Sequence, residues 1–73
     1  MVRVKYVGYL ASLAGVREEE VDADNVRLGD ILRLKGNVNW EEIIILVNGK
    51  PANLDTRVSD GDEVTVLPFT SGG

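Results

Sequence analysis

The sequence contains no cysteine, so neither a disulfide nor a cysteine-ligated zinc ion can hold its fold together. A domain of 73 residues buries only about 60% of the surface that its unfolded chain exposes. Such a chain depends on one apolar core, and its hydrophobic content of 44% and charged content of 27% are typical of folded domains. We therefore predict a single domain over residues 1–73.

The composition argues against several functional classes. Histidine is absent as well, which removes the commonest general base and the commonest metal ligand together. Asp60, Asp62 and Glu63 could gather a metal ion, but an acidic turn between strands needs no ligand, so we predict no metal site. The net charge of −4 argues against nucleic acid, which attracts basic surfaces. No stretch approaches the ~18 apolar residues of a membrane span, and we expect a cytoplasmic protein without membrane contact.

Local patterns predict the elements of the first part of the chain. Apolar and charged residues alternate over residues 2–6, which predicts a strand with one buried face. Apolar residues at helical spacing over residues 10–14, followed by Gly15, predict a short helical turn. The acidic run within residues 17–21 predicts a solvated edge strand.

The remaining chain supplies one longer helix and further strands. Apolar residues at i, i+3 and i+4 from Leu28 predict the main helix over residues 28–35. The continuous β-favouring run over residues 43–47 predicts a strand buried on both faces. Asn48-Gly49 predicts a hairpin into a short strand, and a final strand leads into the C-terminus.

This order of elements predicts the α+β class and, within it, a β-grasp (ubiquitin-like) roll. One main helix covers a mixed sheet in such a roll. In this arrangement the first and last strands are expected to lie adjacent and parallel at the centre of the sheet, which explains why both are rich in apolar residues. The C-terminus then projects from a central strand, which makes residues 70–73 a flexible tail on a fixed base.

The tail ends in Gly72-Gly73, and this pair is the candidate reactive end. Glycine lacks a Cβ, so two in succession can enter a channel that a side chain would block. The alternative is an ordinary frayed terminus. Phe69 stands just before the tail, and it is either an exposed interface anchor or a residue that folds back onto the sheet.

With these features in place, the sequence resembles the ubiquitin-like sulfur carriers, and most closely the MoaD-like small subunits of molybdopterin synthase. Thiazole-pathway carriers, called ThiS, share the fold and the double glycine but usually lack the segment that ends at Gly15. The resemblance covers nearly the whole chain, and its terminal stretch is the most specific part. It is carried by residues 9–15, 28–32, 47–49, 60–64 and 67–73.

The resemblance implies a carrier and not an enzyme. An adenylating, ubiquitin-activating-like enzyme would use ATP to activate the Gly73 carboxylate, and a sulfur donor would convert the acyl adenylate into a thiocarboxylate. The chain itself would bind no cofactor. In a molybdopterin synthase the tail would enter the large subunit and deliver sulfur to a pterin precursor, a step of molybdenum cofactor biosynthesis. The site residues implied are Gly72 and Gly73 at the reactive end and Leu67, Pro68, Phe69, Thr70 and Ser71 for partner binding.

Three alternatives remain open at this point. The activated Gly73 could form isopeptide bonds with lysines, which would make the chain a ubiquitin-like protein modifier. The sulfur could instead serve thiamine synthesis or tRNA thiolation. The chain could also be a stand-alone β-grasp interaction module whose tail never reacts. Two departures from the family pattern, Gly8 in place of a larger residue and Arg27 in place of a Ser or Thr helix cap, are each expected to cost about 1 kcal/mol of local stability.

Overall fold

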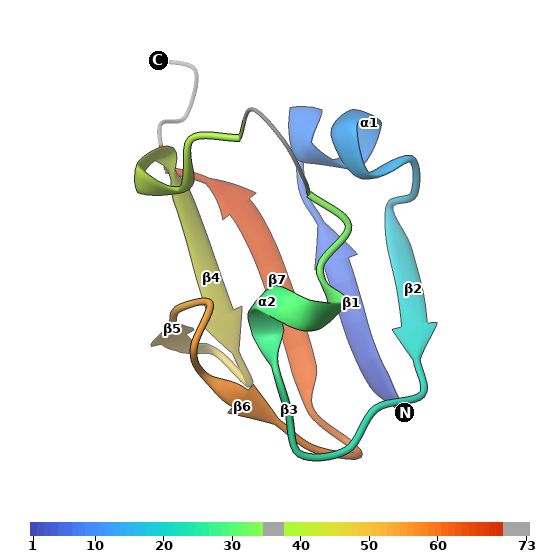
Figure 1. Ribbon diagram of the computed structural model, residues 1–73. Coiled ribbons are helices and arrows are strands. Elements are labelled where there is room, and N and C mark those ends of the chain that lie inside the picture. The colour runs from blue at the N-terminus through green and yellow to red at the C-terminus, as the bar shows by residue number, and fades with distance from the viewer. Residues whose placement is uncertain (35–37, 70–73) are drawn as a thin grey trace.

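A five-stranded mixed sheet, with strand order β2-β1-β7-β4-β5, forms the body of the protein in the computed structural model, which describes residues 1–34 and 38–69 (Figure 1). A smaller two-stranded sheet pairs β3 with β6. This architecture confirms the predicted α+β, β-grasp fold. The elements in chain order are β1 Val2–Tyr6, α1 Tyr9–Ala14, β2 Glu18–Val21, β3 Val26–Arg27, α2 Leu28–Ile31, the 3₁₀ turn η1 Trp40–Glu42, β4 Ile43–Val47, β5 Lys50–Ala52, β6 Arg57–Val58 and β7 Glu63–Pro68.

The central strand of the large sheet is β7. It runs parallel to β1, with Val4 opposite Val64, and antiparallel to β4, with Ile45 opposite Val66. The prediction of adjacent, parallel first and last strands is therefore confirmed. The acidic strand β2 lies at one edge of the sheet, as its charge predicted, and β5, which contains Pro51, lies at the other.

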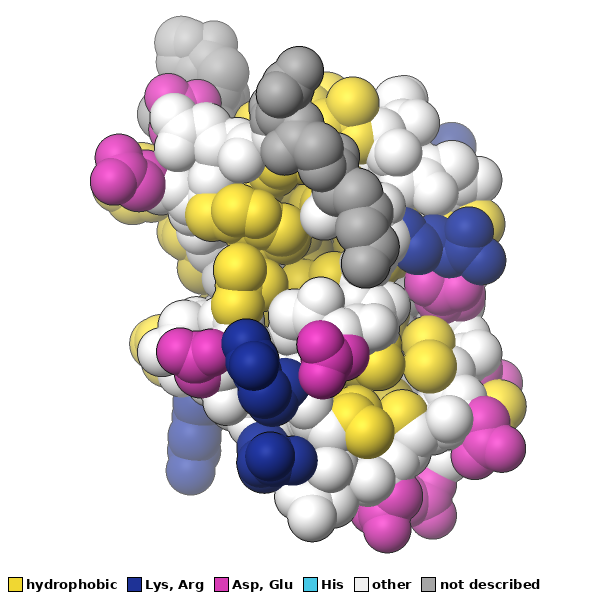
Figure 2. All heavy atoms as spheres, in the orientation of Figure 1, with side chains coloured by type: hydrophobic (Ala, Val, Ile, Leu, Met, Phe, Trp, Pro, Cys, Tyr) yellow, Lys and Arg dark blue, Asp and Glu magenta, His cyan; other side chains and the backbone are white. Residues whose placement is uncertain are grey.

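One face of this sheet carries the core. The alternation in β1 buries Val2, Val4 and Tyr6, while Arg3 and Lys5 stay exposed on the opposite face. Hydrophobic side chains are visible on the core side, which faces the viewer in Figure 2 as in Figure 1. All the buried hydrophobic residues of the described chain belong to one cluster: Val2, Val4, Tyr6, Leu10, Ala14, Leu28, Leu32, Leu34, Ile45, Val58, Val64 and Val66.

The predicted main helix is much shorter than expected. α2 ends at Ile31, and Leu32 already has an extended backbone with φ −75° and ψ 142°. The prediction of a helix over 28–35 was therefore wrong in its extent, and residue 35 lies outside the described residues. The extended backbone allows Leu32 and Leu34 both to enter the core, on either side of an exposed Arg33.

Tertiary contacts explain why the helix stops. The backbone N–H of Arg33 donates to the Tyr6 hydroxyl at 2.8 Å, so it has a partner outside any helix. Arg33 Nε also donates to Glu19 Oε1 at 2.8 Å, which ties the segment to the edge strand β2. Burial is the main cause that raises the pKa of Tyr6, so the hydroxyl stays neutral in the core while its oxygen accepts this bond.

The start of α2 lacks a side-chain cap, as the presence of Arg27 indicated. Its first backbone N–H groups are nevertheless satisfied by the neighbouring loop. Leu28 N–H donates to the Thr56 carbonyl and Gly29 N–H to the Leu54 carbonyl, both at 2.9 Å. These bonds take the place of a cap, since unpaired N–H groups at a helix start need an acceptor.

Strand β4 is not buried on both faces, so that prediction was wrong. Of its five residues only Ile45 is buried, while Ile44 and Leu46 are half-buried on the face opposite the core. Both helices lie on the core side of the sheet in Figure 1. An apolar strand therefore exposes part of its surface on the other side.

A polar clamp joins the turn after β4 to the start of β7. The Asn48 side chain donates through Nδ2 to Asp62 Oδ1 at 3.0 Å and accepts through Oδ1 from the Glu63 N–H at 2.9 Å. Asp62 also accepts from the Ser59 N–H at 2.8 Å. The Asn48 backbone N–H completes the clamp by donating to the Glu63 carbonyl at 2.8 Å.

This clamp should make stability depend on acid pH. The Ser59 N–H, followed by the Asn48 amide, lowers the pKa of Asp62 below its ordinary value of 3.8. A depressed folded-state pKa contributes stability that is present above the unfolded pKa and is lost as pH falls through the folded pKa. We expect the thermal midpoint of unfolding to decrease as the pH drops below about 4. In Asp62→Asn, which preserves an oxygen acceptor, the thermal midpoint should decrease less over the same pH range. Differential scanning calorimetry across the acid range measures both, and identical pH profiles of the two proteins would contradict a role for Asp62.

Candidate functional site

The central strand β7 positions the candidate reactive end. It is paired on both sides, and beyond its last residue the Phe69 N–H donates to the Glu42 carbonyl at 2.7 Å. The chain is thus held to η1 at Phe69, directly before the predicted tail. The predicted site residues Thr70, Ser71, Gly72 and Gly73 lie outside the described residues, so their roles stay predictions.

The three described site residues do not share one surface. Leu67 is half-buried and lies opposite Ile44 on the face away from the core. Pro68 points to the core side, opposite Ile43 in the register. Phe69 is 64% exposed, so it does not fold back to cap the sheet. Its exposure leaves it available as an anchor for a partner.

Gly8 is required by the backbone conformation of the turn from β1 into α1. Its φ of 64° and ψ of −139° form a conformation that residues with a Cβ rarely adopt. A Cβ added there would also lie 3.6 Å from Pro68 Cγ, in ordinary contact. The expectation that glycine costs stability here was wrong, because the turn from β1 into α1 requires it.

A second set of apolar residues lies beside Leu67 and was missed in the sequence. Ile44 faces Leu67 across the β4–β7 pair, and Val7 follows the β1 residue opposite Val66. We call Val7, Ile44, Leu46 and Leu67 the open-face patch. Val7 is 43% exposed and the other three are half-buried. The sequence does not reveal the patch, because a continuous apolar run predicts a strand with both faces covered.

Charged residues of β1 and β2 border this patch on the same face of the sheet. Arg3 and Lys5 of β1 lie opposite Glu20 and Glu18 of β2 in the register. Arg3 Nε lies 3.3 Å from Glu18 Oε2, and both side chains are about half exposed. An apolar centre with a charged border is the usual anatomy of a protein–protein interface.

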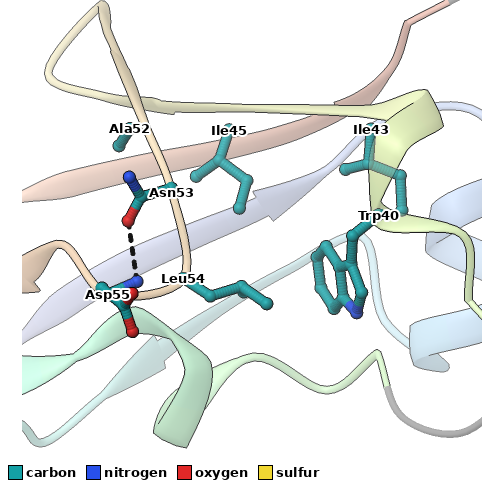
Figure 3. Close-up of a pocket in the computed structure, with 7 residues that line it drawn as sticks. All are labelled: Trp40, Ile43, Ile45, Ala52, Asn53, Leu54 and Asp55. Atoms are coloured by element: carbon teal, nitrogen blue, oxygen red, sulfur yellow. Dashed lines mark hydrogen bonds between the residues drawn. The ribbon is translucent and has the colours of Figure 1, made fainter.

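A pocket of about 480 Å³ lies on the core side of the sheet, next to η1 and β4 (Figure 3). Its walls come from Trp40, Ile43, Ile45, Ala52 and Leu54, with Asn53 and Asp55 at one end. The Asp55 N–H donates to Asn53 Oδ1 at 2.8 Å, and the Asp55 carboxylate pairs with Arg27 at 3.0 Å. These polar groups already have partners, Asn53 within the loop and Asp55 also on β3, and the lining contains no nucleophile or general base beyond that paired carboxylate.

The part of the chain that the structure describes offers neither a candidate metal centre nor a membrane-spanning helix. Residues 1–34 and 38–69 contain no group of three or more acidic side chains arranged to hold a metal ion. Within the same residues, no helix has the length and apolar character needed to cross a membrane.

Comparison with known proteins places this arrangement in a family. The ThiS family model matches residues 4–73, which is nearly the whole chain. The chain belongs to the ThiS family. As a ThiS family member, it is a sulfur carrier of the ThiS/MoaD type or a ubiquitin-like modifier.

Solved structures of similar proteins represent both possibilities. SAMP1 from Haloferax volcanii is 30% identical with a TM-score of 0.77, and the match covers 99% of this ThiS family chain and 98% of SAMP1. A putative molybdopterin converting factor, subunit 1, from Pyrococcus furiosus is also 30% identical, with a TM-score of 0.71 and coverage of 94% and 97% of the two chains. A complex of subunits 1 and 2 of the molybdopterin-converting factor from Helicobacter pylori matches at 24% identity and a TM-score of 0.60, over 99% and 97% of the chains, and supports the fold alone.

Proposed function

We propose that this protein is a sulfur carrier and the small subunit of a molybdopterin synthase. The observation that carries the proposal is the path of β7, which is held by β1 and β4 and leads through Phe69 toward Gly72-Gly73. The likeness to the subunit 1 protein of Pyrococcus furiosus favours the molybdopterin pathway. Thiamine synthesis and tRNA thiolation use the same carrier chemistry and are the alternatives within this class.

The chemistry assigns catalysis to partner enzymes. An adenylating enzyme joins a Gly73 carboxylate oxygen to the α-phosphorus of ATP and releases pyrophosphate. A sulfur donor then displaces AMP and leaves a thiocarboxylate on Gly73. The activation is necessary because a free carboxylate is a poor acyl electrophile, and this chain contains no cysteine that could carry the sulfur instead. The carrier itself holds no cofactor in this scheme, and ATP binds to the activating partner.

The docking surface of the carrier follows from the same strand. We assign partner binding to Leu67, Pro68 and Phe69 and to the following residues 70–71, and Leu67 links this segment to the rest of the open-face patch. A large subunit that accepts the tail would contact Phe69 at the base of the tail. A tail that is anchored by apolar contacts loses less conformational freedom on binding than a free peptide does.

Intact-mass analysis of the protein isolated from its native cell tests the proposal. We expect a fraction of the protein to carry sulfur in place of one oxygen, and this fraction to disappear when the adenylating enzyme is deleted. A carboxylate form alone in both strains, together with no ATP-dependent activation in vitro, would show that the tail is inert.

A modifier function is the second candidate, because SAMP1 of Haloferax volcanii is equally identical to this chain. That protein is the small archaeal modifier protein 1 of Haloferax volcanii. The same activated Gly73 would then form an isopeptide bond with the lysine of a target. Denaturing immunoblots of native cells separate the two functions, since conjugates survive reduction and boiling whereas a carrier stays at its own mass.

Phe69→Ala should weaken binding to the activating enzyme or the large subunit by about 1 to 3 kcal/mol, the range for an exposed aromatic anchor. Its thermal midpoint should barely change, because the ring is 64% exposed. Calorimetric titration measures the affinity, and Phe69→Leu should keep most of it. Normal affinity with a large loss of stability would show instead that Phe69 belongs to the core.

A further inference from the structure

Asn48-Gly49 combines a reactive dipeptide with a side chain that is held in place. Glycine has no Cβ to hinder attack by its own backbone nitrogen, and nothing lies within 4 Å of the position that a Gly49 Cβ would occupy. Both residues are exposed and have positive φ values, 52° and 84°. Every other asparagine in the sequence is followed by a bulky apolar residue.

We propose that Asn48 is a site of spontaneous deamidation that the folded protein protects through Asp62 and Glu63. In this reaction the Gly49 nitrogen gives its proton to solvent and bonds to Asn48 Cγ. The Cγ–Nδ2 bond breaks and Nδ2 leaves as ammonia, taking a proton from solvent. Water then opens the resulting succinimide to aspartate or isoaspartate, so that the net reaction consumes one water and releases one ammonia.

The clamp opposes the first step. Ring closure makes Cγ tetrahedral and expels Nδ2, so the planar side-chain amide cannot keep both of its present partners. It gives up the bond from Nδ2 to Asp62 Oδ1 at 3.0 Å and distorts the bond that Oδ1 accepts from the Glu63 N–H at 2.9 Å. Asp62 is itself fixed by the Ser59 N–H at 2.8 Å, so it cannot readily follow.

The product would damage the sheet that positions the tail. An aspartate at position 48 loses the Nδ2 donor and places a second carboxylate against Asp62. An isoaspartate also lengthens the backbone inside a two-residue turn, between Val47 and Lys50, which are register partners. Because β4 pairs with β7, the strain falls beside the strand that leads to Phe69.

Timed incubation of the full chain at neutral pH, followed by peptide mapping, tests the proposal. We compare wild type with Asp62→Ala, which removes the acceptor, and Asp62→Asn, which keeps an oxygen acceptor. Loss of one hydrogen bond to a charged group should speed deamidation at Asn48 about tenfold in Asp62→Ala. Asp62→Asn should stay closer to wild type. All three proteins should react at the same faster rate in concentrated urea.

Leu10→Ala provides the matched control. Leu10 is fully buried on α1, so this variant lowers global stability without touching the clamp. If deamidation required complete unfolding, Leu10→Ala would accelerate it at least as much as Asp62→Ala. That result would overturn the proposal. Equal deamidation rates for folded and unfolded wild type would overturn it too, as would faster deamidation at Asn25, whose φ is also positive.

Discussion

Deletion of Gly73 is expected to abolish ATP–pyrophosphate exchange by the adenylating partner. The proposed reaction takes place at the terminal carboxylate, and removal of one residue withdraws that carboxylate by up to ~3.5 Å from the position it must reach. A displacement of about 1 Å can already cost 100-fold in rate when reacting groups must be aligned. The measurement is exchange of labelled pyrophosphate into ATP with the cognate enzyme and saturating carrier.

Gly72→Val serves as the companion variant. It keeps the terminal carboxylate and the chain length but adds a branched side chain to the part of the tail that must enter the enzyme. Exchange should fall strongly while the thermal midpoint stays that of wild type. Full pyrophosphate exchange with the Gly73 deletion would contradict the assignment of Gly73 as the reactive group. Full exchange with Gly72→Val would contradict only the claim that the tail enters a channel too narrow for a side chain.

Leu32→Ala is expected to destabilise the fold by about 2 to 5 kcal/mol, as much as Leu28→Ala. Leu28 belongs to α2, whereas Leu32 lies in extended backbone beyond it, yet the two are 0% and 2% exposed. Both therefore cover the sheet to the same degree, and a truncation of either leaves a cavity above it. Chemical denaturation with urea measures the two free energies of unfolding.

Leu13→Ala is the control with the same chemical change. Leu13 lies on α1 and is 57% exposed, so its truncation should alter the free energy of unfolding by less than about 0.5 kcal/mol. A small effect of Leu32→Ala beside a large effect of Leu28→Ala would mean that α2 alone covers the core. Because a domain of this size has little stability in reserve, the two buried variants should also be partly unfolded at 37 °C.

Much of the fold followed from local patterns. The alternation in β1 fixed which of its residues are buried, because successive side chains of a strand point to opposite faces. Gly15 ends α1 in the left-handed conformation that glycine favours, with φ 84°. The acidic residues of β2 indicated an edge strand, since central strands seldom tolerate such charge.

The errors arose where a residue's surroundings outweighed its local preference. The spacing of Leu28, Ile31 and Leu32 is helical. The Tyr6 hydroxyl nevertheless accepts a hydrogen bond from the Arg33 N–H, and the helix ends at Ile31. The β-favouring run of β4 predicted a strand, but it could not tell whether one face or both were covered. That depends on where distant helices pack, and here they cover a single face.

For the candidate site, the sequence by itself determined the ending in Gly72-Gly73, the resemblance that names Gly73 as the reactive group, and the aromatic residue just before the tail. Only the tertiary structure decided that Phe69 is exposed, that the chain is held at Glu42, and that Ile44 and Val7 adjoin Leu67 on the uncovered face. The physical reason is that burial and cross-strand contact join residues far apart in the chain. Local sequence determines chemistry and conformational preference, whereas the packing of the whole chain decides which side chains remain in contact with solvent.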